Sequence, residues 1–247
     1  MIFNIAFNEL RRLFLSPLAW IILAIVQFLL AIFFFVLLSS YLEPGSAFRG
    51  RGLTEIVVVG MLQIAGLLLV LVCPFLSMRL FSEEQRSGSL LLLMSSPISV
   101  TEMVLGKYLG MILFLSILLL VIALMPFALL LGSKLDYGQL ASGLTGLALL
   151  MSTFSAIGLF ASTLTRQPAA AGVSAFAVIF LLWIIHIAGN TGNEQMTSVF
   201  SYLSMLRHYN NLLSGMFSSV DVIYYILLSS CFIVLSIWRL DAMRSYH

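Results

Sequence analysis

Six long apolar stretches, separated by shorter polar ones, dominate the pattern of residues along the chain. A helix needs about 20 apolar residues to cross the hydrocarbon layer of a bilayer, and each stretch reaches that length. The pattern therefore predicts an all-α protein with transmembrane helices at residues 18–40, 56–78, 109–132, 140–164, 169–189 and 220–238. The first stretch is too long for a signal peptide and has no small-residue cleavage site after it, so we expect an uncleaved span.

The composition agrees with an integral membrane protein. The chain is 61% hydrophobic and 9% charged, whereas soluble domains carry roughly 25% charged residues. We infer that lipid covers its outer faces. The net charge of +2 and the absence of a basic run argue against a nucleic-acid partner. Cys73 and Cys231 both lie in apolar stretches, where they indicate neither a disulfide framework nor a metal site.

The positive charges predict the orientation. Six spans place both termini on one side of the membrane. With the termini inside, the cytoplasmic set is Arg11, Arg12, Arg79, Arg86, Lys107, Arg166, Arg239 and Arg244. The outer set is Arg49, Arg51, Lys134 and Arg207. Because Lys and Arg near span ends favour the cytoplasm, this distribution predicts that both termini are cytoplasmic.

Residues 1–17 predict an amphipathic helix that lies in the headgroup layer. The residues that recur at helical spacing on its apolar stripe are Phe3, Phe7, Leu10 and Phe14, while Asn4, Asn8, Arg11 and Arg12 lie largely off that stripe. Pro17 ends the helix. The alternative is a simple N-terminal extension of the first span.

The spans themselves carry little that indicates chemistry. The fourth, LASGLTGLALLMSTFSAIGLFASTL, is rich in small residues, which favours a central, closely packed helix; a substrate-lining helix is the alternative. No span has a charged residue near its middle, which argues against an ion-coupled transporter. The chain has no GxxxxGK[ST] and no Gly-x-Ser-x-Gly, so we expect no ATP site and no catalytic residue. A membrane protease that uses His186 and a serine is the remaining enzymatic alternative.

Between the second and third spans lies the polar stretch RLFSEEQRSGSLLLLMSSPIS, residues 79–99. Arg79, Glu83, Glu84 and Arg86 would each cost about 2.5–3.5 kcal/mol at the centre of a membrane helix. We therefore expect these charges to project into the cytoplasm or into another protein.

The remainder of this stretch predicts a turn, a short apolar segment and a new helix. Gly88 permits a sharp change of direction, and Pro97 stops a helix. Ser99 followed by Glu102 resembles a capping box that opens the third span. The LLLLM segment at 90–94 is typical of a docking element, since exposed apolar patches mark contact sites. The alternative is a loop tucked against the protein's own membrane surface.

The run FSEEQRSGSLLLLMSSPISVTEMVLGKYLG resembles the segment after the second span of ABC-2 type permeases, the membrane subunits of a class of ABC transporters. The residues that carry the resemblance are Glu83, Glu84, Arg86, Gly88, Ser89, Leu90–Leu93, Pro97, Ile98, Ser99, Gly106 and Lys107. The opening FNELRRLFLSPLAWI resembles the amphipathic entry helix of the same family. Near the C-terminus, His208, Gly215 and Asp221–Tyr224 are similar to the gliding-motility-associated branch of that family.

The resemblance implies a permease subunit with the type V ABC exporter architecture, which couples ATP hydrolysis by a partner to movement of a substrate. Its partners would be two ABC ATPase subunits, which bind ATP and magnesium, and a second permease subunit, identical or different. The chain itself would hold no cofactor, and it would lie in a prokaryotic inner membrane. The alternative function is an ATP-driven scaffold or mechanotransmission subunit without transport, and the sequence does not identify a substrate.

The same resemblance implies two sets of site residues. The residues expected to couple to the ATPase are Phe81, Glu83, Glu84, Arg86, Gly88, Leu90, Leu91, Leu92 and Pro97. The outer stretch 190–219 would form short cap or re-entrant helices that help close the exit, with His208, Tyr209 and Gly215 as the extracytoplasmic gate. Within this cap we expect His208 to form structural hydrogen bonds, and contact with a substrate is the alternative.

Overall fold

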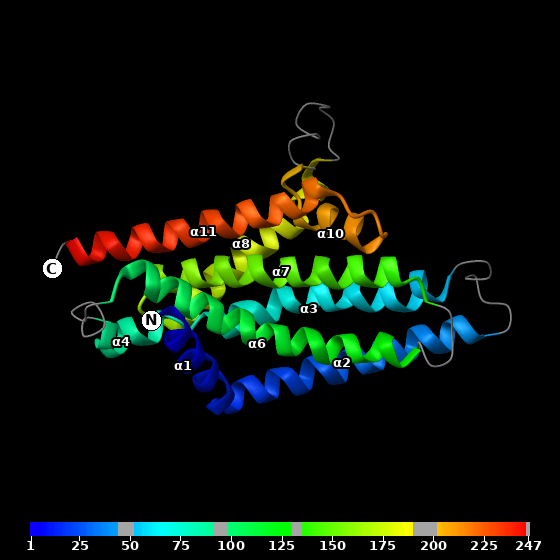
Figure 1. Cartoon of the computed structure of the whole chain (residues 1–247), viewed down its shortest axis with the longest axis horizontal. Coiled ribbons are helices and arrows are strands. Elements are labelled where there is room, and N and C mark those ends of the chain that lie inside the picture. The colour runs from blue at the N-terminus through cyan, green and yellow to red at the C-terminus, as the bar shows by residue number, and fades with distance from the viewer. Residues whose placement is uncertain (44–51, 91–97, 130–134, 190–201, 246–247) are drawn as a thin grey trace.

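Six long helices form the body of the protein in a computed structural model, which describes residues 1–43, 52–90, 98–129, 135–189 and 202–245 (Figure 1). They are α2 (Pro17–Leu42), α3 (Val59–Ser77) with the π-helical turn η1 (Thr54–Val58) before it, α6 (Val100–Leu129), α7 (Tyr137–Leu164), α8 (Pro168–Gly189) and α11 (Ser219–Ser245). All six are long and apolar enough to cross a membrane. The described residues contain no strand, so the prediction of an all-α protein with six spanning helices is confirmed.

Three shorter helices lie at the ends of the bundle: α1 (Ile2–Leu15), α4 (Ser82–Ser87) and α10 (Met205–Leu213). Figure 1 shows α1 and α4 at the same end as both chain termini, with α10 toward the other end. On α1, Ala6 and Glu9 are buried, while Phe3 and Phe7 are exposed. An amphipathic helix is therefore present, and its place in the headgroup layer stays a prediction.

Two of the long helices extend beyond the predicted apolar limits. α6 begins at Val100, because Ser99 and Glu102 form the expected capping box. The Ser99 hydroxyl accepts from the Glu102 backbone N–H at 3.2 Å, and the Glu102 carboxylate accepts from the Ser99 backbone N–H at 3.2 Å. α11 continues to Ser245, past the predicted end at 238. Hydropathy finds the part of a helix that suits lipid, whereas capping groups determine where its hydrogen bonds begin.

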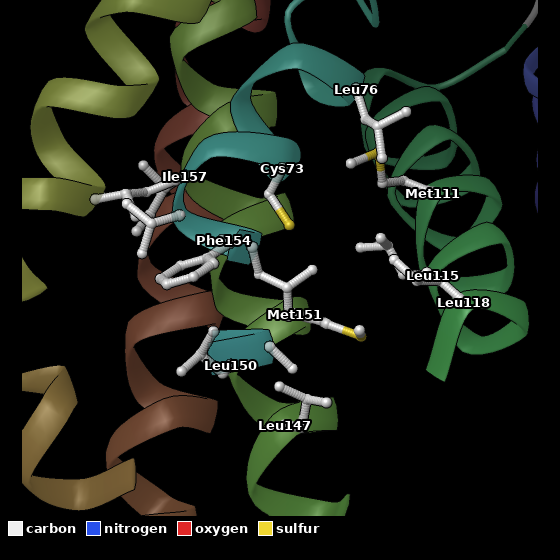
Figure 2. Close-up of a cluster of buried hydrophobic side chains, with 14 of the residues drawn as sticks. Cys73, Leu76, Met111, Leu115, Leu118, Leu147, Leu150, Met151, Phe154 and Ile157 are labelled. Atoms are coloured by element: carbon white, nitrogen blue, oxygen red, sulfur yellow. The ribbon is translucent and has the colours of Figure 1, made fainter. Parts of the chain in front are cut away.

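α7 is the central helix of the bundle. In its most apolar window 67% of the residues are buried, against 11% for α2, which lies at the periphery. Figure 2 shows the core that α7 shares with α3 and α6: Met151 and Phe154 of α7 lie near Cys73 of α3, and Met111 and Leu115 of α6 face them. The prediction of a closely packed fourth span is confirmed.

Small residues on α7 allow its neighbours to come close. A Cβ atom added at Gly158 would lie 1.9 Å from the Ser77 hydroxyl of α3, and one added at Gly143 would lie 2.7 Å from Leu62. On another face of α7, the hydroxyls of Thr153 and Ser229 are hydrogen-bonded at 2.9 Å, which joins α7 to α11. Such approaches and hydroxyl contacts hold membrane helices together where apolar burial alone cannot, since lipid is equally apolar.

The close approach at Gly158 yields a stability prediction. We expect Gly158→Ala to lower the thermal unfolding temperature of the detergent-solubilised protein, because its methyl group would overlap Ser77 and overpacking costs about 1–3 kcal/mol. Ser77→Gly in the same chain should recover part of the loss. Gly52→Ala is the control, since nothing lies within 4 Å of the added atom there. Equal unfolding temperatures for Gly158→Ala and the unmodified protein would contradict this packing.

Candidate functional site

The short helix α4 follows α3 after a turn and carries most of the charges that the sequence singled out. Glu83 and Glu84 lie in its first turn and Arg86 in its last, an arrangement that complements the helix dipole. Gly88 ends the helix with a φ of 76°, a left-handed conformation that favours glycine. The predicted change of direction at Gly88 is confirmed.

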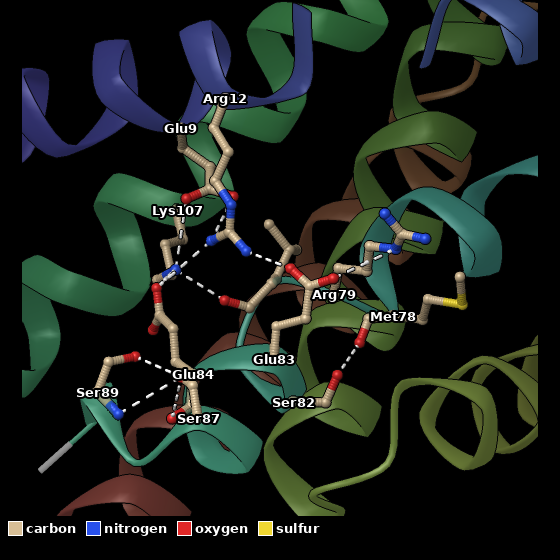
Figure 3. A network of polar contacts seen from close by, with 11 residues as sticks. Glu9, Arg12, Met78, Arg79, Ser82, Glu83, Glu84, Ser87, Ser89 and Lys107 are labelled. Atoms are coloured by element: carbon tan, nitrogen blue, oxygen red, sulfur yellow. Dashed lines mark hydrogen bonds and ion pairs between the residues drawn. The ribbon is translucent and has the colours of Figure 1, made fainter. Parts of the chain in front are cut away.

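Lys107 of α6 is the cation at the centre of this region (Figure 3). Its side chain is only 4% exposed, and its ammonium lies 2.6 Å from Glu84 Oε1 and 3.4 Å from Glu9 Oε2. It also donates to the Leu80 carbonyl at 2.7 Å, in the turn between α3 and α4. The Phe81 ring lies beneath it, 5.0 Å from the ammonium to the ring centroid. One buried charge thus holds three segments together.

Arg12 of α1 and Arg79 complete the network. Arg12 pairs with Glu83, and its guanidinium lies 3.6 Å from Glu84 and 3.8 Å from Glu9. Arg79 Nε lies 3.5 Å from Glu83 Oε1. We call the six residues the charge cluster: Glu9, Arg12, Arg79, Glu83, Glu84 and Lys107. Its three cations and three carboxylates balance. Lys107, Glu9 and Glu84 form its poorly solvated part, whereas the side chains of Arg12, Arg79 and Glu83 are 42%, 44% and 38% exposed.

Two glycines of α6 bring α1 within reach of Lys107. A Cβ atom at Gly106 would lie 2.7 Å from Ile5, and one at Gly110 would lie 2.8 Å from the Ala6 carbonyl and from Glu9. The backbone of α1 therefore packs directly on α6, in the way that two small residues four apart permit. Glu9, which faces this contact, reaches the ammonium of Lys107.

Three of the predicted coupling residues, Phe81, Glu83 and Glu84, form contacts within the protein itself. The expectation that the charges project into the cytoplasm or into another protein is wrong for Glu84, whose side chain is 14% exposed and pairs with Lys107. Glu83 pairs with Arg12 and Arg79 but remains 38% exposed, so the expectation is not contradicted there. Burying the ammonium of Lys107 requires carboxylate partners, and Glu84 and Glu9 supply them. The Phe81 side chain is fully buried and supports Lys107.

The remaining predicted coupling residues divide between exposed, buried and undescribed positions. Arg86 and Gly88 are exposed, and Leu90 is buried. Leu91, Leu92 and Pro97 lie outside the described residues. A coupling role for this region stays a prediction.

Glu9, Arg12 and Lys107 are the members of the charge cluster that sequence reasoning did not connect. Glu9 and Lys107 are 98 positions apart, so no local pattern joins them. A signal was nevertheless present. The segment GKYLG places two glycines four residues apart around a lysine, and the amphipathic N-terminal helix contains one acidic residue. The two glycines allow another helix to pack beside Lys107, and the N-terminal helix carries a single carboxylate that can pair with this lysine.

At the opposite end of the bundle, α10 is anchored by Tyr209. Its ring is fully buried, close to Gly66 of α3 and Gly146 of α7, and its hydroxyl donates to the Leu62 carbonyl at 2.6 Å. Burial raises the pKa of the Tyr209 hydroxyl above its ordinary value, so the group remains a donor. α10 therefore cannot leave the bundle without breaking a buried hydrogen bond and exposing an aromatic ring.

His208 binds α10 to the start of α11. One ring nitrogen, Nδ1, pairs with Asp221, and the other donates to the Tyr202 carbonyl at 2.8 Å. Both ring nitrogens therefore face oxygen atoms, one on the Asp221 side chain and one on a backbone carbonyl. The ring also stacks on Tyr224 at 4.2 Å. The hydrogen-bonded role expected for His208 within the cap is confirmed.

The chain leaves α10 at Gly215, which has a φ of 83°. A short ordered helix was expected in the outer segment, and α10 is such a helix, while residues 190–201 lie outside the described part. A gate role for His208, Tyr209 and Gly215 stays a prediction.

The charge cluster yields a second stability prediction. We expect Lys107→Met to destabilise the protein by about 3–5 kcal/mol, because it leaves Glu9 and Glu84 buried without their central cation. Adding Glu9→Gln and Glu84→Gln should restore much of the loss. Arg11→Met, at an exposed cation on α1, is the control. Thermal unfolding in detergent measures the stability of these three variants. An unfolding temperature unchanged by Lys107→Met would contradict the stabilising role of the charge cluster.

Comparison with known proteins gives one family. The model of a family described as ABC-2 family transporter protein matches residues 3–243, which is nearly the whole chain. The search of curated proteins found no match to this chain. The six apolar helices and this match indicate a multi-pass membrane protein, the permease subunit of an ABC transporter. In that family ATP is hydrolysed by a separate ATPase subunit with which the permease associates. From the N-terminal amphipathic helix to the end of α11, this chain belongs to the ABC-2 family of transporter proteins.

Proposed function

We propose that this protein is the permease of an ABC exporter in a prokaryotic inner membrane, with both termini in the cytoplasm. The orientation rests on the concentration of Lys and Arg at the end of the bundle that holds both termini and α4. Two ATPase subunits and a second permease subunit, identical or different, complete the transporter.

The charge cluster is the observation that carries the proposed mechanism. In this proposal residues 79–99 seat in a cleft of the ATPase and present the exposed part of α4, with Arg86, Ser87 and Gly88, to it. Because Glu83 and Glu84 are held by Arg12 and Lys107, a displacement of α4 is passed directly to α1 and α6. Separating the buried Lys107 from Glu84 and Glu9 is costly, so the three segments move as one body.

At the outer end, α10 closes the exit. Tyr209 fixes this helix to α3, and the pair of His208 and Asp221 fixes it to α11. A movement that begins at α4 reaches α10 through α3 and α7, which are among the helices that α10 contacts. The positive φ of Gly215 marks the joint at which the cap meets α11. The exposed, phenylalanine-rich α2 would line the pathway together with α8 and with their counterparts in the second permease subunit.

A mechanotransmission subunit, whose helices are rearranged by ATP hydrolysis without transport, is the second candidate. The charge cluster would transmit a movement of α4 to α1 and α6 in a mechanotransmission subunit as well. Measuring substrate movement in proteoliposomes that contain the ATPase separates the two. The C-terminal run around His208 and Asp221 supports placement in the gliding-motility-associated branch of the family.

The coupling role is tested with a bulky residue on the exposed part of α4. We expect Ser87→Trp to reduce both co-purification with the ATPase and stimulation of ATP turnover, because an indole there would obstruct the docking surface. Ser87 is exposed, and its side chain bonds only locally, to Glu84 and Ser89, so the thermal stability of the permease should change little.

Ser214→Trp is the matched control, since Ser214 is also exposed but lies at the end of α10 on the opposite side of the bundle. If the two variants support the same ATPase binding and turnover, α4 is not the coupling element. A reversal of Glu83 and Glu84 is a poorer test, because it would also break the charge cluster.

A further inference from the structure

A groove of about 1040 Å³ lies beside the charge cluster, between the end of α3, α4 and the beginning of α8. It is larger than the shallow depression of about 430 Å³ next to His208. Its polar end is lined by three arginines, Arg79, Arg86 and Arg166, together with Glu83. Its other end is lined by apolar side chains of α3 and α8.

Two of the three positive charges in this groove, those of Arg86 and Arg166, are not compensated by any residue that the structure describes. Glu83, the carboxylate in the lining, already pairs with Arg12 and Arg79. Arg86 and Arg166 are exposed, and neither forms an ion pair or a hydrogen bond through its guanidinium with any described residue. Two guanidiniums that line one groove favour a ligand with several acceptor oxygens, such as a phosphate, which arginine binds through two parallel hydrogen bonds.

The apolar wall continues from the arginines into the predicted membrane. Leu71 and Phe75 of α3 are 49% and 54% exposed, and Val173 of α8 is 69% exposed. Gly172 and Ala169 of α8 also line the groove. From Arg79 to Leu71 the wall follows eight residues, roughly 12 Å along the helix. That is close to the ~15 Å thickness of one hydrocarbon leaflet.

We propose that the groove binds one anionic phospholipid of the cytoplasmic leaflet. Its phosphate lies between Arg86 and Arg166, and an acyl chain lies along Phe75, Leu71 and Val173. The inference rests on the orientation in the proposed function, which places these arginines at the cytoplasmic surface, where anionic lipids and basic pockets between helices meet. An acidic segment of the ATPase is the competing occupant, but it would not extend along an apolar wall in the hydrocarbon layer.

Native mass spectrometry of the purified full-length chain in a zwitterionic detergent tests the proposal. Phosphatidylglycerol and phosphatidylcholine are the probes, added separately. We expect one retained phosphatidylglycerol and much weaker retention of phosphatidylcholine. Arg86→Gln with Arg166→Gln should weaken phosphatidylglycerol binding at least about tenfold, the usual effect of losing a charge-assisted hydrogen bond. Val173→Trp should also weaken it, because it fills the apolar part and leaves both arginines in place.

Arg11→Gln with Arg239→Gln is the matched control, since it removes two exposed arginines at the same end of the bundle but outside the groove. It should leave binding unchanged. Equal retention of the two lipids overturns the proposal, as does an equal loss of binding in the control variant. It is also overturned if Arg86→Gln with Arg166→Gln retains the lipid but loses co-purification with the ATPase. Lipid binding is measured without the ATPase, so its failure is distinct from failure of the coupling role.

Discussion

A buried ammonium must be paired, and the pairing of Lys107 determines how one end of this protein is built. Its partners are Glu9 of α1, Glu84 of α4 and the Leu80 carbonyl in the turn between α3 and α4. α4 has only six residues and α1 lies outside the bundle of long helices. Removing any one partner would leave charge without compensation in a poorly solvated site, which makes the arrangement cooperative.

The packing that permits this pairing depends on glycine. Gly106 and Gly110 allow the backbone of α1 to lie on α6, and Gly158 allows α7 to pack closely against α3. The two close contacts link the charge cluster to the central helix. α7 in turn contacts α10, where Tyr209 and His208 are held by buried hydrogen bonds. A continuous set of rigid contacts thus joins the end of the bundle near both termini to the opposite end.

Sequence reasoning predicted the six helices, because a span of lipid-compatible residues has a length that a bilayer dictates. It also predicted the capping box at Ser99, the turn at Gly88 and a hydrogen-bonded His208, all of which depend on local chemistry. It did not predict the partners of Glu83 and Glu84, because such pairing joins residues far apart in the chain. Charges next to a span were interpreted as solvent-facing. Lys107 lies before the predicted third span, but it is buried in α6 and requires counter-charges. The groove at Arg86 and Arg166 likewise exists only once α4 and α8 are adjacent.

The central claim is that α1 and α4 move as one body. Its most direct test is a spin-label distance measurement between Arg11→Cys on α1 and Ser89→Cys just after α4, with Cys73 and Cys231 replaced by alanine, in labelled protein that still co-purifies with the ATPase. The permease is studied in complex with its ATPase, with and without bound ATP. We expect one narrow distance distribution that is the same in both states, and a broad one when Lys107→Met is added. A distribution that shifts on ATP binding in the unmodified cluster would contradict the account.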